Sequence, residues 1–327
     1  MTTSTLTELV RRGDWQRRLG FSLSSGVTVG LLIAVTVLNA AIQPTFFTTY
    51  SITSTFATFT PAVLAAIAAA IVIIGGGLDL SIGSIVALAS VSAVVVMNGD
   101  PARAGLGIVT SILVGAACGF VNGLVVGVVR LQPLIATFAT SSVFAGAALV
   151  VLPTPGGLVP SVITDSYRSA VAGVPVPVLL VLGAVGLYLV FSRTQLMRHI
   201  RAVGGDRAAA FASLVPVVRV QIASYVVAGV LAGLAAAAVV ANTGSGDPFV
   251  GSSMAMDSIA AVVLGGIALS GGSGSAVGAV AGALILGIVS NVLSFLGIPT
   301  TWRQLTSGLV IIVALALSVL TSRRVQR

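Results

Sequence analysis

Long apolar runs separated by short polar segments make up nearly the whole chain. Ten of these runs approach the length of about 20 residues that an α-helix needs to cross the hydrocarbon core of a bilayer. Residues 108–129 and 277–289 are almost continuously apolar and lack the alternation typical of β-barrel strands. The pattern therefore predicts an all-α polytopic membrane protein. The ten predicted helices cover residues 21–42, 56–74, 80–98, 105–128, 133–152, 175–192, 217–241, 256–270, 275–297 and 304–321.

Composition agrees with this class of protein. Hydrophobic residues make up 57% of the 327 residues and charged residues only 7%, which excludes a water-soluble globule. We expect a transmembrane domain over residues 21–321, a cytoplasmic interfacial segment over 1–20 and a cytoplasmic tail over 322–327. The first twenty residues contain Glu8 and Asp14 and lack a long apolar core, so no secretory signal is expected.

The positions of the basic side chains predict an orientation. All sixteen are arginine, and the chain has no lysine. With a cytoplasmic N-terminus, thirteen arginines fall in inside segments and only Arg103, Arg168 and Arg303 fall outside, as the positive-inside rule requires. Both termini are then cytoplasmic. Because the arginines flank spans and are not interleaved with aromatic residues, the net charge of +8 does not indicate nucleic-acid binding.

Residues for catalysis or metal binding are scarce. Cys118 is the only cysteine and lies in an apolar run, and the single histidine, His199, has no carboxylates at ligand spacing. We therefore expect neither an enzyme nor a metal site. A phosphate-binding loop of the G-x-x-x-x-G-K-[ST] type needs a lysine that the chain does not have, so ATP-driven work would require a separate ATPase subunit.

Glycines recur every four residues in two of the predicted helices. Small residues at this spacing let helix backbones approach closely in lipid. Generic helix packing is one interpretation, and a contact surface that moves during gating is the other. The glycines concerned are Gly115, Gly119, Gly123, Gly274, Gly278 and Gly282.

Two acids interrupt the apolar pattern beside glycine-flanked segments. Asp79 lies in the run GGGLDLSIGS, and Asp257 lies in MDSIAAVVLGG. Interrupted helices of this kind surround substrate paths in transporters, where an intramembrane acid is a candidate functional group. Each acid also stands at a predicted helix start, where a carboxylate caps free backbone amides. Both interpretations stay open.

The other polar residues at the spans serve either interhelical hydrogen bonds or the lining of a path. Because so few of the residues titrate, proton or sodium coupling has little support. These residues, added to the two acids as candidates for a translocation path, are Ser81, Asn122, Gln132, Ser258 and Asn291.

The longest inside loop, residues 193–219, combines arginines with a Gly-Gly break and an alanine-rich stretch. The stretch after the break has high helix propensity and predicts a short helix parallel to the membrane. Docking of a cytoplasmic partner is one use, and a loop that only sets orientation is the alternative. The candidate docking residues are Arg198, Arg201, Gly204, Gly205, Asp206, Arg207, Ala209 and Phe211.

Four blocks in order resemble a known family. They are GGGLDLSIGS at 75–84, Asn122-Gly123 followed by LQPLIAT at 131–137, IRAVGGD at 200–206, and MDSIAAVVLGG at 256–266 with GGSG at 271–274. From about Ala62 to Leu317 the chain is similar to permease subunits of ribose-type ABC importers. It departs from them at Met197-Arg198, where the family has Gly-Arg, at Asp206, where it has Asn, and at Ala255-Met256, where it has Glu-Leu.

The resemblance implies a type II ABC-importer-like bundle in a bacterial inner membrane. It implies a second permease copy or a similar permease as partner, ATPase subunits that bind ATP and Mg²⁺, and an extracytoplasmic binding protein that delivers a simple sugar or similar small polar solute. The loop at 204–211 would be the coupling helix. A self-sufficient secondary transporter or facilitator is the alternative function, and the solute itself cannot be read from the chain.

Overall fold

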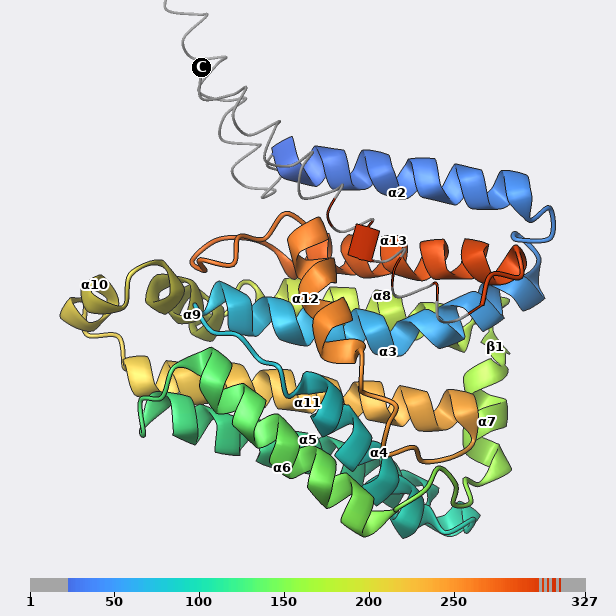
Figure 1. Cartoon of the computed structure of the whole chain (residues 1–327), viewed down its shortest axis with the longest axis horizontal. Coiled ribbons are helices and arrows are strands. Elements are labelled where there is room, and N and C mark those ends of the chain that lie inside the picture. The colour runs from blue at the N-terminus through green and yellow to red at the C-terminus, as the bar shows by residue number, and fades with distance from the viewer. Residues whose placement is uncertain (1–22, 300–301, 303–304, 306–307, 310–311, 313–327) are drawn as a thin grey trace, which may run out of the picture.

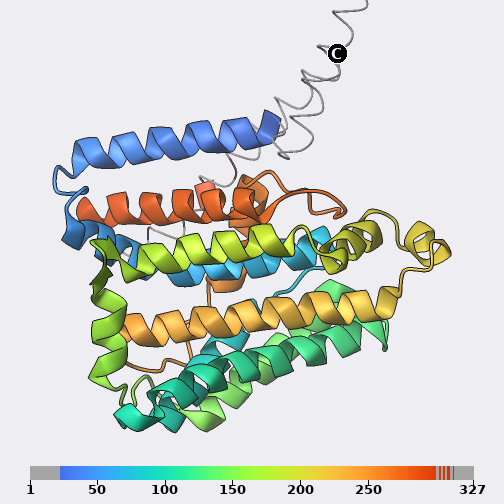
Figure 2. The same cartoon turned by 180° about the vertical axis from the view of Figure 1, so that it is seen from behind.

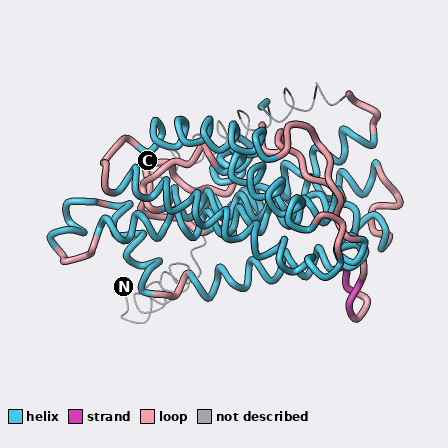
Figure 3. Tube along the Cα trace, turned by 90° about the horizontal axis from the view of Figure 1, so that it is seen from below, coloured by secondary structure: helices cyan, strands magenta, loops and turns pink. Residues whose placement is uncertain are grey.

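The structure is a computed structural model that describes residues 23–299 together with residues 302, 305, 308, 309 and 312 (Figure 1). The elements are α2 (Leu23–Ile42), α3 (Thr49–Ile74), α4 (Ile82–Met97), the 3-10 helix η1 (Pro101–Arg103), α5 (Ala104–Gly127), α6 (Pro133–Val151), α7 (Ser161–Arg168), β1 (Ala170–Val171), β2 (Val174–Pro175), α8 (Val176–Phe191), α9 (Gln195–Gly205), α10 (Arg207–Ala212), α11 (Val217–Thr243), α12 (Met254–Leu264) and α13 (Ala276–Phe295). Within the described residues, strand is confined to the antiparallel hairpin of β1 and β2, seen at one edge of Figure 3. The predicted all-α membrane class is confirmed.

Most of the predicted spans coincide with helices, but the helices differ in length. By length and composition, α3, η1 with α5, α6, α11 and α13 are able to cross a membrane, and α8 with α9 forms a further span if their 77° bend is counted as one broken helix. The apolar helices α2, α4 and α12 are shorter. The prediction of a full span at 256–270 is wrong, because the 11 residues of α12 reach only about 16 Å, half of a hydrocarbon core of about 30 Å. The predicted segments 1–20 and 322–327, and nearly all of 304–321, lie outside the described residues.

Helix α3 forms the centre of the bundle. In its most apolar window, 89% of the residues are buried. It packs against α8, α11, α12 and α13, while α2 lies farther out against α13 (Figure 1). On the other side of α11 lies α5, and α4 connects α5 with α6 through its contacts to both. Apolar residues cover all sides of the second half of α3, which is typical of a helix enclosed by protein or lipid, and here protein encloses it.

Helices α5 and α11 meet along the first glycine stripe. A Cβ at Gly115 would overlap the carbonyl oxygen of Gly229, and one at Gly119 would overlap the carbonyl oxygen of Tyr225. A Cβ at Gly123 would lie 2.7 Å from the Cα of Ile222. The two backbones therefore touch directly, which only small residues allow.

The second stripe joins α12 and α13. A Cβ at Gly278 would overlap the carbonyl oxygen of Gly265, and one at Gly282 would overlap that of Ala261. Gly274, which the spacing placed in the same stripe, lies before the first residue of α13 and has a φ of 124°. Its role is therefore a sharp loop conformation and not helix packing.

The bundle has two ends, named here the α10 end and the α7 end (Figure 1). At the α10 end, residues 75–76, 131, 133, 203–207 and 221 are among those that line one cavity, so several of the predicted inside loops meet there. At the α7 end, Gly99 N–H donates to the Leu158 carbonyl at 2.8 Å, and Gly156 pairs with Gly246 in a β-bridge. Among the described residues, Arg103 and Arg168 therefore lie at the α7 end, and the predicted inside loop that carries Arg198, Arg201 and Arg207 lies at the α10 end.

Candidate functional site

The chain between α3 and α4 breaks at three glycines and turns around Asp79. Gly76 has a φ of 77°, which starts the turn at the end of α3. Asp79 Oδ1 accepts hydrogen bonds from the backbone N–H of Ser81 at 2.8 Å and from Ser81 Oγ at 2.6 Å. Ser81 is the N-cap residue of α4, and its own side chain makes no capping bond. Asp79 therefore supplies the bond to a free amide that the capping interpretation requires.

Hydrogen bonds extend from Ser81 to two further helices. Asn122 Nδ2 of α5 donates to Ser81 Oγ at 2.6 Å, and Thr140 Oγ1 of α6 donates to Asn122 Oδ1 at 2.6 Å. Thr137 of α6 holds the break itself: Leu80 N–H donates to its hydroxyl at 3.1 Å, and the hydroxyl donates to the Leu78 carbonyl at 3.1 Å. Sequence reasoning missed both threonines, although Thr137 ends the LQPLIAT block.

These five residues, Asp79, Ser81, Asn122, Thr137 and Thr140, are called the Asp79 cluster. Asp79 is 2% exposed, and Ser81 and Asn122 are completely buried. Asp79 Oδ2 has no hydrogen-bond partner within the described part of the chain. Since protein encloses the three groups, the geometry favours interhelical bonding over the lining of an open path. The cluster fixes the relative positions of α4, α5 and α6.

The second acid, Asp257, faces a cavity. The cavity measures about 210 Å³ and lies between α3, α12 and α13. Its polar lining consists of Thr58, Ser253, Asp257, Ser258 and Ser290. Because pockets for drug-sized ligands are about 300–1,000 Å³, this volume suits a smaller solute. Carboxylate and hydroxyl oxygens are hydrogen-bonding groups that match a polyhydroxyl compound.

The capping interpretation is wrong for Asp257. Ser253 is the N-cap residue of α12, and Asp257 lies farther along the first turn. Among the described residues, Asp257 accepts no hydrogen bond from a backbone amide, and its side chain is exposed to the cavity. Ser258 Oγ donates to the Ala255 carbonyl at 2.8 Å within the same helix. Asp257, unlike Asp79, lines this cavity.

Gln132 and Asn291 join neither group. Gln132 is exposed at the start of α6, at the α10 end, and its side chain makes no capping bond. Asn291 lies on α13 with a buried Oδ1 that has no hydrogen-bond partner within the described residues. Neither residue lines the Asp257 cavity, and a role of both in a translocation path stays a prediction.

The long inside loop folds as two helices. Sequence reasoning predicted the second, α10, whose N-terminus is capped by Asp206: the carboxylate accepts bonds from Ala208 N–H at 2.8 Å and Ala209 N–H at 3.0 Å. It missed the first, α9, although Met197, Ile200 and Val203 recur at helical spacing and are buried.

The loop also presents an exposed apolar tip and several cations at the α10 end. Phe211 of α10 is 73% exposed, and Leu214, which follows α10, is 91% exposed. Arg198 and Arg207 are exposed and Arg201 is half-buried. Arg198 Nη1 donates to the Arg193 carbonyl at 3.2 Å. The loop therefore presents a basic surface around the apolar tip formed by Phe211 and Leu214.

Glycine backbones connect this loop to both membrane breaks. Gly272 N–H donates to the carbonyl oxygen of Ile74 at 2.8 Å, and a Cβ at Gly204 would overlap the same oxygen. A Cβ at Gly76 would lie 3.2 Å from the Cα of Gly204, and one at Gly271 would lie 2.8 Å from the Cα of Gly76. These four glycines, Gly76, Gly204, Gly271 and Gly272, are called the glycine junction. The end of α9 thereby touches the end of α3 and the loop between α12 and α13.

A comparison with known protein families decides the class. Residues 51–315 match the family described as the permease component of the branched-chain amino acid transport system. The chain belongs to this permease family. The matched residues cover nearly all the described helices. The Asp79 cluster, the Asp257 cavity and the glycine junction therefore all lie within the matched region.

Individual relatives of this permease are named as permease proteins of ribose, D-allose and autoinducer 2 transport systems. The ribose import permease protein RbsC of Bacillus subtilis is 36% identical over 300 residues, which cover 89% of this chain and 91% of the relative. The D-allose transport system permease protein AlsC of Escherichia coli is 32% identical over 301 residues, which cover 90% of this chain and 92% of the relative. The autoinducer 2 import system permease protein LsrD of Photorhabdus temperata is 34% identical over 251 residues, which cover 74% of this chain and 75% of the relative. No solved structure gives a significant match.

Proposed function

We propose that this permease is the membrane-spanning subunit of an ATP-driven importer in a bacterial inner membrane. Its cargo is a simple sugar or a similar small polar solute, delivered by an extracytoplasmic binding protein. The family match supports the role of permease component. The names of the ribose, allose and autoinducer 2 relatives support this class of cargo. The polar lining of the Asp257 cavity agrees with a hydroxylated solute.

The observation that carries the proposal is the exposed loop at the α10 end and its backbone contact with both membrane breaks. Phe211 and Leu214 offer a partner an apolar anchor, and the arginines around them offer charge. A force applied to α9 reaches α3 and the α12–α13 loop through the glycine junction, with no flexible side chain between them. This arrangement suits a subunit that receives its driving force from outside.

The driving force comes from ATPase subunits docked at the α10 end, which is the cytoplasmic end in this proposal. ATP and Mg²⁺ bind to those subunits, and this chain itself carries no cofactor. Binding and hydrolysis of ATP favour one of two conformations of α9 and α10, so access to the path alternates between the two sides. A second permease, identical or similar, completes the path, and the loops at the α7 end receive the binding protein.

Reconstitution in vesicles tests the scheme directly. Purified permease is incorporated with its ATPase and binding protein, and entry of radiolabelled ribose and allose is followed with and without ATP. We expect uptake only when all three components and ATP are present. Uptake by the permease alone, or without ATP, would contradict the proposal and favour a self-sufficient transporter.

Replacing both tip residues, Phe211→Ser and Leu214→Ser, should release the ATPase. A buried aromatic and aliphatic anchor typically contributes about 2 kcal/mol or more to an interface, which corresponds to more than tenfold in affinity. We expect the amount of ATPase that co-purifies with the permease to fall at least about tenfold. The matched control is Phe249→Ser, which removes an exposed aromatic side chain (54%) from a loop near the α7 end. Equal loss of ATPase from both variants would argue against docking at the tip.

Asp257→Asn tests the cavity. The change keeps the volume of the side chain but replaces a charged hydrogen-bond acceptor, and hydrogen bonds to charged groups contribute about 1.5–3 kcal/mol. We expect uptake of the preferred solute to fall about tenfold or more, with unchanged ATPase binding. Asp165→Asn, an exposed acid of α7 that does not line the cavity, is the control. Normal uptake by Asp257→Asn would remove Asp257 from the path.

A further inference from the structure

A groove lies between α8 and α11. Both helices lie toward the viewer in Figure 2. Its volume is about 830 Å³. Helix α8 forms one side, α11 and the start of α5 form the other, and Leu64 of the central helix α3 contributes to the lining between them. Helix α7, which stands roughly perpendicular to α8 and α11 at their ends in Figure 2, contributes Val162, Ile163, Ser166 and Tyr167.

Helix α7 is held firmly in this position. The Tyr167 hydroxyl donates a 2.9 Å hydrogen bond to the Ala57 carbonyl of α3. Burial raises the pKa of Tyr167 to about 12, so the phenol keeps its proton at physiological pH. Arg168 Nη2 also donates to the Asn242 carbonyl at the end of α11, at 2.9 Å. The groove is thus a built feature with a fixed end.

The interior of the groove is apolar and its α7 end is polar. Leu180, Gly183 and Leu187 face it from α8, and Leu231 and Leu234 face it from α11. Apart from the Tyr167 phenol, the side-chain hydroxyls in the lining belong to Ser166 and Ser169, both in or beside α7. An occupant therefore has a hydrocarbon body and a polar head at the α7 end.

The depth of the groove matches one leaflet of a bilayer. Its lining on α8 extends from Val176 to Leu187, or about 16 Å at 1.5 Å per residue, which is half of the hydrocarbon thickness of about 30 Å. The groove is apolar along this depth and polar at the α7 end, which suits an acyl chain whose headgroup lies at the α7 end.

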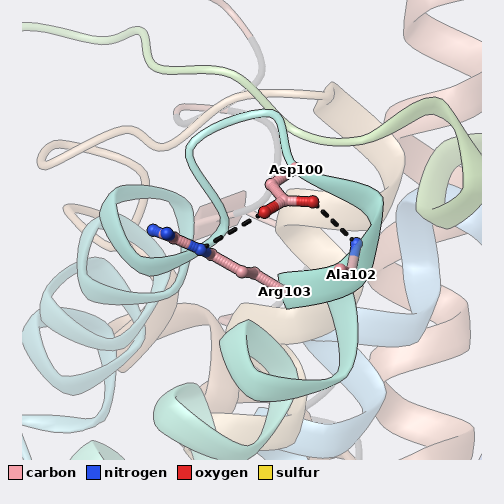
Figure 4. Close-up of polar contacts among 3 residues, drawn as sticks. All are labelled: Asp100, Ala102 and Arg103. Atoms are coloured by element: carbon pink, nitrogen blue, oxygen red, sulfur yellow. Dashed lines mark hydrogen bonds and ion pairs between the residues drawn. The ribbon is translucent and has the colours of Figure 1, made fainter.

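A cation stands beside the polar end. Pro101 and Ala104 line the groove, and Arg103 lies between them in sequence. Arg103 Nε is 3.3 Å from Asp100 Oδ2, and Asp100 Oδ1 accepts a bond from Ala102 N–H at 2.9 Å (Figure 4). Both charged side chains are about half exposed, and the terminal nitrogens of Arg103 point away from the carboxylate. These terminal nitrogens of Arg103 remain open to an anionic headgroup.

We propose that this groove binds one acyl chain of a membrane phospholipid from the leaflet on the α7 side. The lipid fills the space between α8 and α11, and its phosphate lies near Arg103. The site is independent of the translocated solute and of the ATPase. It makes a specific lipid part of the folded permease.

Two glycines on α8 provide a matched test. Gly183 lines the groove, and Gly186 does not; at either position an added Cβ meets no atom within 4 Å. Gly183→Phe therefore places a ring in the groove, and Gly186→Phe places the same ring at an exposed position outside the lining. The full-length permease is purified in mild detergent, and bound phospholipid is counted by native mass spectrometry.

We expect wild type and Gly186→Phe to retain one phospholipid under activation that strips annular lipid, and Gly183→Phe to retain none. Adding phosphatidylglycerol to delipidated protein should raise the Tm of wild type and Gly186→Phe and leave that of Gly183→Phe unchanged. Wild type and both variants carrying the same number of lipids, or a wild type that keeps none, would overturn the proposal. The Tm of each delipidated protein shows whether it is folded before lipid is added.

Discussion

A Gly204→Ala permease should reach the membrane and bind its ATPase but import solute at least about tenfold more slowly than wild type. The added Cβ overlaps the carbonyl oxygen of Ile74 and lies 2.9 Å from both Gly272 N and Gly75 C. All three are backbone atoms, so no side-chain rotation relieves the contact and the end of α9 must move. Since α9 connects the docking tip with both membrane breaks in the proposed mechanism, its displacement uncouples ATP hydrolysis from uptake.

Gly205→Ala is the control for this experiment. A Cβ at Gly205 has as its nearest neighbour the Cα of Gly272 at 3.8 Å, an ordinary contact. Both substitutions add one methyl group to the end of the same helix, so any change in helix propensity is the same. Uptake and ATPase activity are measured in the same vesicles. If the two variants import at equal rates while both remain folded, the glycine junction does not transmit the motion.

Gly119→Leu should largely prevent folding of the bundle. Its Cβ overlaps the carbonyl oxygen of Tyr225 and lies 3.1 Å from the Cα of Val226, so α5 and α11 would have to separate along their length. Overpacking of a rigid interior costs about 1–3 kcal/mol and occasionally more, and here backbone faces backbone. We expect little monodisperse protein, with a Tm lower by about 5 °C or more in what is recovered.

Gly105→Leu makes the same change at the start of the same helix, where an added Cβ has no neighbour within 4 Å. This variant should be purified in normal yield with a nearly unchanged Tm. Size-exclusion chromatography and thermal unfolding of both variants, expressed side by side, give the comparison. A normal yield and Tm for Gly119→Leu would mean that α5 and α11 are not in such close contact.

The helical class and the contacts of α5 and α11 were predictable from the sequence because they depend on local patterns. An apolar run indicates a span, and a glycine every fourth residue indicates a close helix pair. The same rule misplaced Gly274, since spacing alone does not show where α13 begins. It also made α12 too long, because residues 265–270 are apolar in part but turn at Gly265 and Gly266, where Gly266 has a φ of 78°.

The candidate site was only partly predictable. Asp79 and Asp257 have a similar sequence signature, an acid at a predicted helix start next to a glycine-flanked segment. One is enclosed by α4, α5 and α6 and the other faces a cavity, and that difference depends on helices distant in sequence. Gln132 and Asn291 show the same limit, because polarity within an apolar span does not reveal which neighbour it faces. The glycine junction forms where three segments distant in sequence meet. The spacing of residues within one segment does not show which other segments it contacts.

The meeting of α9 with α3 and the α12–α13 loop depends on the absence of side chains there. In the proposed mechanism the joint transmits movement through backbone atoms, and the residues that line the Asp257 cavity take no part in it. Substitutions in that lining should therefore change the cargo that is accepted and leave the linkage intact. Chimaeras that exchange α12 and α13 between relatives of different cargo, with both ends of the joint kept as glycine, are the natural constructions for changing selectivity.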